Sequence, residues 1–267
     1  MTAFNSDNRN DNGAQTVRKA LVVLDALRDL AGSQRLADLA ASTGMSPTVV
    51  HRLLVELKAA GLVEQVEGSR EYRLGIGVLS YASAVLRRSG LVTVGPPIAR
   101  SIRDEWSETV TLQIRSGAER VVVFEAEGLH DLRHRAPIGQ RMPLYSNASG
   151  RAIMAFLSDD EIDRALAAPF RQYTERTLTS PGEIREQLHA IRESGLATAQ
   201  NQTRLGIASI ATPIFGLTEE PVGSLAVSGP SARLGEAPPE LAGAVLAAGL
   251  EISRRLGFHG QPPWSGQ

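Results

Sequence analysis

The chain has no cysteine among its 267 residues. This absence excludes disulfide bridges and thiolate metal sites, and it fits a reducing compartment such as the cytoplasm. The histidines do not replace the missing ligands. His130 and His134 are four residues apart, but they flank or occupy an expected strand, where this spacing separates them by about 13 Å. We therefore expect no metal site.

Catalytic patterns are missing as well. The sequence has no glycine-rich phosphate loop, no nucleophile elbow around Ser149-Gly150 and no conspicuous pair of carboxylates. We therefore expect neither an enzyme nor a cofactor.

Long hydrophobic runs are absent too. No segment approaches the roughly 18 consecutive apolar residues of a membrane helix, and the N-terminus lacks the apolar core of a signal peptide. We expect a cytoplasmic protein with no membrane partner. Residues 1–13 are polar, and we expect them, like residues 259–267, to form disordered tails.

The chain has little excess charge of either sign, with a net charge of −1, but the charge is unevenly distributed. Residues 13–90 contain ten Lys and Arg against seven Asp and Glu, a net of +3, whereas residues 91–267 have a net of −3. A basic excess attracts nucleic acid phosphates. Because +3 is modest, we expect two copies of the chain to bind one DNA site together.

The segment from residue 36 to residue 74 is the most informative part of the sequence. Gly44 stands where a helix would end in the left-handed conformation, Ser46 can cap the next helix, and Pro47 suits its first position. A strand-like hairpin around Gly68 follows. The predicted elements of this domain are helices at 16–30, 36–43 and 47–60 and strands at 62–66 and 71–74. This order is typical of a winged helix-turn-helix that binds double-stranded DNA.

The helix at 47–60 is the predicted recognition helix. Its apolar stripe includes Val50, Leu53 and Leu57, which leaves the opposite side chains free to contact bases or phosphates. The hairpin tip could reach a phosphate or the minor groove. The candidate DNA contacts are Ser46, Thr48, Val49, His51, Arg52 and Arg70.

A linker over residues 76–90 is predicted to join the DNA-binding domain (14–75) to a second domain (91–258). It contains an amphipathic helix at 77–88, which could pack on a second subunit. A break is expected over Gly90–Pro97, with a new helix starting at Pro96-Pro97. The elements predicted beyond it are strands at 109–115, 120–125 and 131–136, helices at 146–157, 159–167 and 181–194, strands at 197–200, 207–215 and 222–228, and a helix at 237–256. This order predicts an α+β fold in which helices flank an antiparallel sheet.

Small residues cluster where strands and helix starts of the second domain should converge. They could surround a small-molecule pocket, with positive or titratable groups supplied by Arg133, His134 and Arg135. Close packing of a helix on a sheet also favours Ala, Ser and Gly. On spacing alone, plain packing is the better supported of the two interpretations.

Six ordered segments of the chain resemble the IclR-type (isocitrate lyase regulator) family of transcriptional regulators. They are SPTVVHRLLVELKAAGLVE, EYRLGIGVL, PIGQRMPLYSNASGRAIMAFL, TLTSPGEIREQLHAIRESGLATA, LGIASIATPIF and GSLAVSGPSARL. The resemblance implies a winged helix-turn-helix, a linker helix and a GAF-like effector-binding domain in a homodimer or dimer of dimers that represses or activates catabolic genes. The positions of the family's effector cavity fall on His134, Met142, Ala148, Ser149, Ile207, Ser209, Ala226 and Ser228.

Two segments depart from the family pattern. Residues 199–202 read AQNQ where the family often has acidic residues, and Tyr145-Ser146 replaces a His-Ala or His-Thr pair. Both changes make the expected pocket less acidic, and Arg133 and Arg135 lie nearby. We therefore expect an anionic effector, an organic or aromatic carboxylate. Two alternatives remain at this point, namely a second domain that only oligomerises and an enzyme that carries a DNA-binding domain.

Overall fold

The computed structural model describes residues 7–30, 32–167, 169–262 and 264, and the side chains of residues 7–12 are left out. The chain divides into two compact units, residues 1–88 and 89–267. No helix in the described part of the chain is long and apolar enough to cross a membrane. Each unit has its own hydrophobic core, so each is considered by itself.

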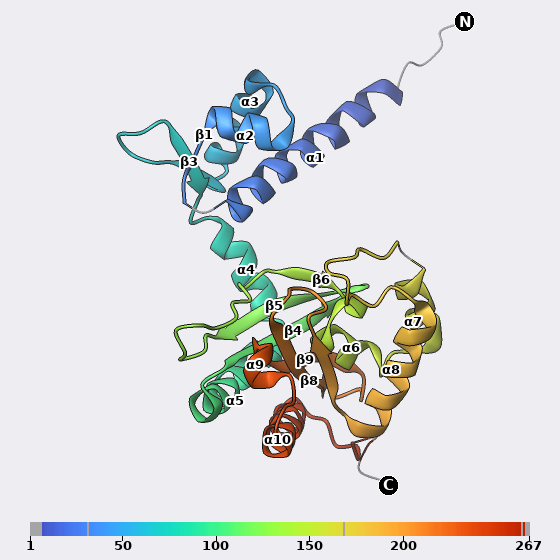
Figure 1. The fold of residues 1–267 in the computed structure, drawn as a ribbon. Coiled ribbons are helices and arrows are strands. Elements are labelled where there is room, and N and C mark those ends of the chain that lie inside the picture. Colours follow the sequence, from blue (N-terminus) through green and yellow to red (C-terminus); the bar gives the residue numbers. More distant parts are fainter. Residues whose placement is uncertain (1–6, 31, 168, 263, 265–267) are drawn as a thin grey trace, which may run out of the picture. The chain divides into compact units, whose positions relative to one another are not determined.

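The first unit is a helical cluster with a small sheet (Figure 1). Its elements are α1 (Asp7–Asp29), β1 (Gln34–Arg35), α2 (Leu36–Thr43), α3 (Pro47–Ala59), β2 (Val63–Gln65), β3 (Glu71–Leu74) and α4 (Val78–Leu86). The three strands pair antiparallel in the order β1-β3-β2. Val23 and Leu27 of α1 pack with Leu39 of α2 and the inner stripe of α3. The predicted order of helices and hairpin is confirmed, and β1 is an addition to it.

Helix α1 differs from its prediction at the N-terminal end. It begins at Asp7 rather than near Thr16, so residues 7–13 of the expected disordered tail are helical, while residues 1–6 lie outside the described residues. Val17 and Leu21 are 61% and 55% exposed. The buried face is instead set by Val23 and Leu27, because only the C-terminal half of α1 packs against this core.

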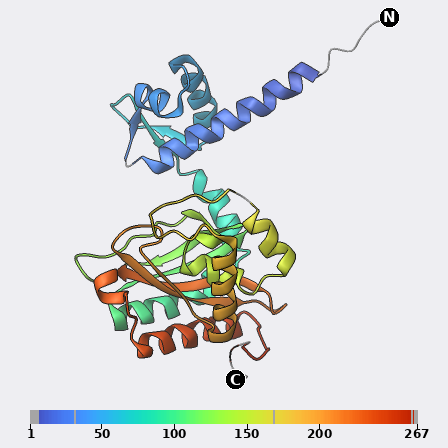
Figure 2. The same ribbon diagram turned by 45° about the vertical axis from the view of Figure 1, so that its right-hand side comes forward.

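The second unit is a six-stranded antiparallel sheet with helices on both faces (Figures 1 and 2). Its order is β6-β5-β4-β9-β8-β7. The strands are β4 (Thr109–Ser116), β5 (Glu119–Ala126), β6 (Arg141–Pro143), β7 (Ala197–Gln200), β8 (Ile207–Phe215) and β9 (Pro221–Pro230). The helices are α5 (Gly90–Trp106), the 3-10 turn η1 (Leu144–Ser146), α6 (Ala148–Met154), α7 (Asp159–Leu166), α8 (Pro181–Ser194), α9 (Ser231–Leu234) and α10 (Pro239–Arg255).

Alternation along β8 assigns the helices to the two faces of the sheet. Thr212 meets Gly249 of α10, whereas its neighbour Ala211 joins the core formed with α6, α7 and α8. Successive side chains of a strand point to opposite faces. Helices α5 and α10, which contact each other, therefore cover one face, and the α6 layer covers the other. The α+β class and the flanked antiparallel sheet are confirmed.

Three local predictions for this unit are wrong. No break precedes Pro96-Pro97, because both prolines lie inside α5, at the cost of the backbone hydrogen bonds they cannot donate. Residues 131–136 form a loop, not a strand, and the strand of this region is β6. In the expected disordered C-terminal tail, the ring of Trp264 lies against Phe156 and Phe215 and over Gly195, while residues 263 and 265–267 lie outside the described residues.

The core of the first unit supports a stability prediction. Leu54 is 1% exposed on α3, and its neighbour Val55 is 50% exposed. We expect Leu54→Ala to lower the free energy of unfolding of this unit by about 2–5 kcal/mol, because it leaves a cavity. Val55→Ala should change it far less. Hydrogen exchange of the amides in residues 13–88 would measure the effect, and equal losses in the two variants would contradict this packing.

Candidate functional site

The outer face of α3 is the first candidate site. Because Val50, Leu53 and Leu57 are buried, the side chains of Thr48, His51 and Arg52 face solvent, as predicted. Val49 is half-buried against the core of the unit. The face presents a cation, an imidazole and a hydroxyl on the first turns of a helix, which suits contacts with bases and phosphates.

The turn before α3 is formed as predicted except for its cap. Gly44 has φ +67° at the end of α2, the left-handed conformation that favours glycine. Ser46 occupies the N-cap position, but its hydroxyl makes no capping hydrogen bond, and its backbone carbonyl accepts from the amides of Val49 and Val50 instead. The hydroxyl of Ser46 is therefore exposed at the N-terminus of α3.

The wing carries Arg70 on an ordered hairpin tip. The Ser69 hydroxyl accepts from the Glu71 amide at 3.1 Å, and Gln65 Nε2 donates to the Ser69 carbonyl at 3.2 Å. Within the described residues neither Arg52 nor Arg70 forms an ion pair, so both guanidinium charges are available to an external anion.

The second unit contains a cavity of about 300 Å³ between the sheet, the start of α6 and three loops. The residues that line it are Thr111, Gln113, Arg120, His134, Arg135, Ala136, Gln140, Met142, Asn147, Ser149, Arg171, Tyr173, Thr203, Arg204 and Ser228. Four of them are arginines, and none of these described lining residues is acidic. The cavity is therefore strongly electropositive.

Four of the nine predicted effector residues line this cavity: His134, Met142, Ser149 and Ser228. The other five do not. Arg133 turns away to Glu127, while Ala148 and Ala226 lie deeper in the core. Ile207 and Ser209 are on β8, outside the lining. Ser209 lies beside Ser228 in the strand register, but one strand farther from the cavity.

Arg120 is the most important lining residue that the sequence did not identify. Its side chain, on β5, is buried, with the residue only 5% exposed. Nε donates to Asn147 Oδ1 at 3.3 Å, and Nη1 has no hydrogen-bond partner in the described structure. Burial lowers the pKa of Arg120 to about 10, which still leaves the guanidinium charged at neutral pH. A buried charge without a counter-ion is costly, so this group is suited to bind an anion.

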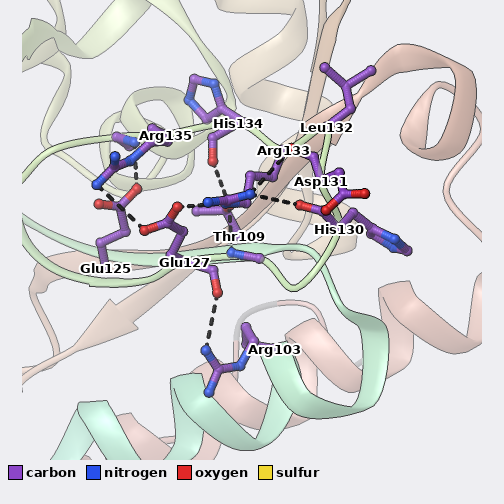
Figure 3. A network of polar contacts seen from close by, with 12 residues as sticks. Arg103, Thr109, Glu125, Glu127, His130, Asp131, Leu132, Arg133, His134 and Arg135 are labelled. Carbon is purple, nitrogen blue, oxygen red and sulfur yellow. Dashed lines mark hydrogen bonds and ion pairs between the residues drawn. The ribbon is translucent and has the colours of Figure 1, made fainter.

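A loop after β5 brings His134 and Arg135 to the cavity, and a polar network holds it (Figure 3). Thr109 Oγ1 donates to the His134 carbonyl at 2.5 Å, and the Ala136 amide donates to Glu125 at 2.6 Å. Arg133 and Arg135 both pair with Glu127, at 2.5 and 3.4 Å. These two arginines hold the pKa of Glu127 below its usual value. Side-chain hydrogen bonds and ion pairs hold this loop in place of backbone pairing with a neighbouring strand. Residues 131–136 therefore form no strand.

His134 is neutral in this setting. The pKa of His134 is lowered to about 4. Burial is the main cause, and the positive charges of Arg204 and Arg120 contribute to the same shift. Its Nδ1 has no hydrogen-bond partner among the described residues. The imidazole can therefore exchange a hydrogen bond with a ligand without adding charge. The described residues contain no cluster of three His, Asp or Glu that could hold a metal.

Two family descriptions match the chain, and together they cover most of both units. Residues 16–67 match the IclR helix-turn-helix domain, and residues 83–254 match the C-terminal domain of bacterial IclR transcriptional regulators.

Relatives match over nearly the whole length. The chain is 28% identical to the transcriptional repressor IclR of Escherichia coli, over 91% of this chain and 90% of the relative. It is 32% identical to the regulator BhcR of Paracoccus denitrificans, over 90% and 87%. An IclR homologue of Microbacterium hydrocarbonoxydans, solved with 4-hydroxybenzoate, has the same fold, with a TM-score of 0.77 at 19% identity over 90% of this chain and 98% of that one.

The neutral His134 predicts a pH dependence. Its folded pKa of about 4 lies below the unfolded value near 6.5, so the folded protein binds fewer protons between these values. The free energy of unfolding should therefore fall as the pH drops from about 6.5 to 4, by up to roughly 3 kcal/mol from this group. His134→Gln should remove that part of the loss. The exposed His259→Gln is the control, and an NMR titration of His134 near pH 6.5 would contradict the assignment.

Proposed function

The chain belongs to the IclR family of bacterial transcriptional regulators, and from this premise we propose that a small organic acid bound in its second unit controls its binding to operator DNA. The chain is a DNA-binding regulator, not an enzyme, as its named relatives are regulators and repressors. The effector, its site and the regulated operon are the proposed part. We place the protein in the cytoplasm, where it reaches DNA.

One observation carries the proposed control. The second unit contains a cavity of about 300 Å³, and the guanidinium of Arg120 in its lining is buried and forms no ion pair with any described residue. A domain that only oligomerises gains nothing from an uncompensated buried charge. A carboxylate would supply the missing acceptor with charge-assisted hydrogen bonds. Arg120 therefore replaces Arg133 as the proposed anchor of an organic or aromatic acid.

The DNA contacts are proposed for α3 and the wing. Thr48, His51 and Arg52 would enter or flank the major groove, and Arg70 would reach a phosphate or the minor groove. Ser46 and Val49 would lie at the edge of the same contact. Because one such module has few free cations, the working species is a homodimer or a dimer of dimers on adjacent half-sites.

Control follows from linkage between the two sites. An effector changes DNA affinity only if it binds one arrangement of the oligomer better than another. DNA must then change effector affinity by the same factor. In this proposal the arrangement that changes is the spacing of two recognition helices relative to successive major grooves.

The DNA contact is tested by Arg52→Ala. The operator would first be selected from random duplexes with the full-length protein. We expect about tenfold weaker binding or more, since a charged hydrogen bond contributes roughly 1.5–3 kcal/mol. A phosphate contact would also reduce the salt slope by about one. Carboxylate binding should stay unchanged. Unaltered DNA affinity would rule out this role, and Lys58→Ala, in the last turn of α3, is the control.

The effector site is tested by Arg120→Met. Removal of an unpaired buried charge should leave the melting temperature of the ligand-free protein equal or higher, while carboxylate affinity falls by at least about tenfold. Thermal shift and calorimetry with succinate, glutarate and benzoate measure both quantities, and Arg120→Lys should be intermediate. A merely structural arginine would instead lower the melting temperature. Stabilisation of the native protein only by neutral or cationic ligands would exclude an acid effector.

A further inference from the structure

We propose that the effector is a small, polar, non-aromatic acid with two separate anionic groups, one bound by Arg120 inside the cavity and the other by Arg171 and Arg204 at its rim. This inference rests on the proposed effector site and specifies what that site selects. It follows from how the guanidinium groups are distributed, how each is neutralised and what lies between them.

The inner position is built around Asn147. Its Oδ1 accepts from Arg120 Nε at 3.3 Å, from the Gly150 amide at 3.1 Å and from Ser149 Oγ at 3.2 Å. With that oxygen engaged three times, Asn147 fixes the guanidinium but leaves Nη1 of Arg120 without an acceptor. A carboxylate of the ligand would occupy this position.

The rim position is built from two loops that bind each other. Thr174 Oγ1 donates to the Asn201 carbonyl at 2.5 Å, and Thr177 Oγ1 donates to the Gln202 carbonyl at 2.6 Å. One loop carries Arg171 and the other carries Arg204. Both side chains line the cavity, yet neither forms an ion pair within the described part of the chain.

Tyr145 positions the first of these loops. Its hydroxyl accepts a hydrogen bond from the Arg171 amide at 2.6 Å, and its ring packs edge-on against Phe170. Tyr145 belongs to one of the two segments that depart from the family pattern, and it lies beside the rim and not in the cavity lining.

Three guanidinium groups without an ion pair among the described residues offer places for more than one negative group, with Arg120 buried and Arg171 and Arg204 exposed. Arg135 is already paired with Glu127 at 3.4 Å, and His134 is neutral. Arg120, Arg171 and Arg204 remain uncompensated among the described lining residues. A monoanion would neutralise only one of these charges, whereas a dianion could neutralise one inside and one at the rim.

The space between the two positions does not favour an aromatic ring. Its lining is mainly polar, and Ala136 and Met142 are its aliphatic residues. Tyr173 is the one described aromatic side chain of the lining, and the guanidinium of Arg171 covers a face of its ring, 5.0 Å from the centroid. One face of this ring is therefore already occupied by a protein group. Amide and hydroxyl groups, including those of Gln140 and Thr203, would instead hydrogen-bond a hydroxy or oxo substituent.

Matched ligands test the second anionic group. Calorimetry on the full-length protein would compare succinate, malate, glutarate and 2-oxoglutarate with succinamate and glutaramate, in which one carboxylate is an amide, and with 4-hydroxybenzoate. We expect the best diacid to bind at least about tenfold tighter than its monoamide or 4-hydroxybenzoate. Equal affinities, or tighter binding of 4-hydroxybenzoate, would overturn the dianion and leave an acid effector in place. If no acid of the panel binds, both proposals are wrong.

Substitutions of the two rim arginines test whether they bind the second anionic group of the ligand. Arg171→Gln and Arg204→Gln should each reduce the preference for the diacid over its monoamide by about threefold or more while leaving monoamide affinity nearly unchanged. Arg254→Gln, an exposed arginine of α10 outside the cavity, should change neither. An undiminished preference in both rim variants would overturn their assignment. Circular dichroism of each variant would confirm that it is folded.

Discussion

An uncompensated guanidinium inside the second unit is the constraint on which the functional interpretation depends. Two arginines are buried among the described residues of this unit, and they differ in how many protein acceptors they have. Arg151 is fully buried, and its two Nη atoms donate to the carbonyls of Tyr145 and Thr198, so it joins α6 to the sheet although its Nε has no partner in the described structure. Arg120 has one side-chain acceptor and lines the cavity, while its Nη1 is buried without a hydrogen-bond partner in the described structure. The first arrangement is structural, and the second leaves a cost that a bound anion can offset.

The start of α6 sets this arrangement because it must lie very close to the turn before it. A Cβ at Gly150 would overlap the carbonyl oxygen of Leu144, so only glycine allows the approach. The same turn places Asn147 as the cap of α6, with its oxygen shared between the Gly150 amide and Arg120. The small residues noted in the sequence thus serve both interpretations that it left open. They pack helix on sheet, and that packing positions the polar groups of a cavity.

Elements with a clear period were predictable, and the cavity was not. The bounds of α2, α8, β7 and β8 follow the sequence because their apolar patterns and caps are local. Thr111 and Gln113 alternate with apolar residues, a pattern that ordinarily places polar side chains in solvent, yet here they face an enclosed space. Arg120, Arg171 and Arg204 come from three distant segments, and only tertiary structure brings them together. The loop at 131–136 was mistaken for a strand because its restraints are side-chain contacts with Thr109, Glu125 and Glu127.

Both units use arginine to bind an anion, but the arginines of the first unit are exposed and Arg120 of the second unit is buried. On α3 and the wing, Arg52 and Arg70 are exposed, so they cost little when unbound and contribute little singly in water. In the cavity, Arg120 is costly when unbound and gains correspondingly more from its ligand, because the surroundings screen charge less. Weak single contacts make DNA affinity dependent on how two copies are placed, since each module adds to the other only when both half-sites are in reach. A strong contact between Arg120 and its ligand could therefore control DNA affinity by changing how the two DNA-binding units are placed.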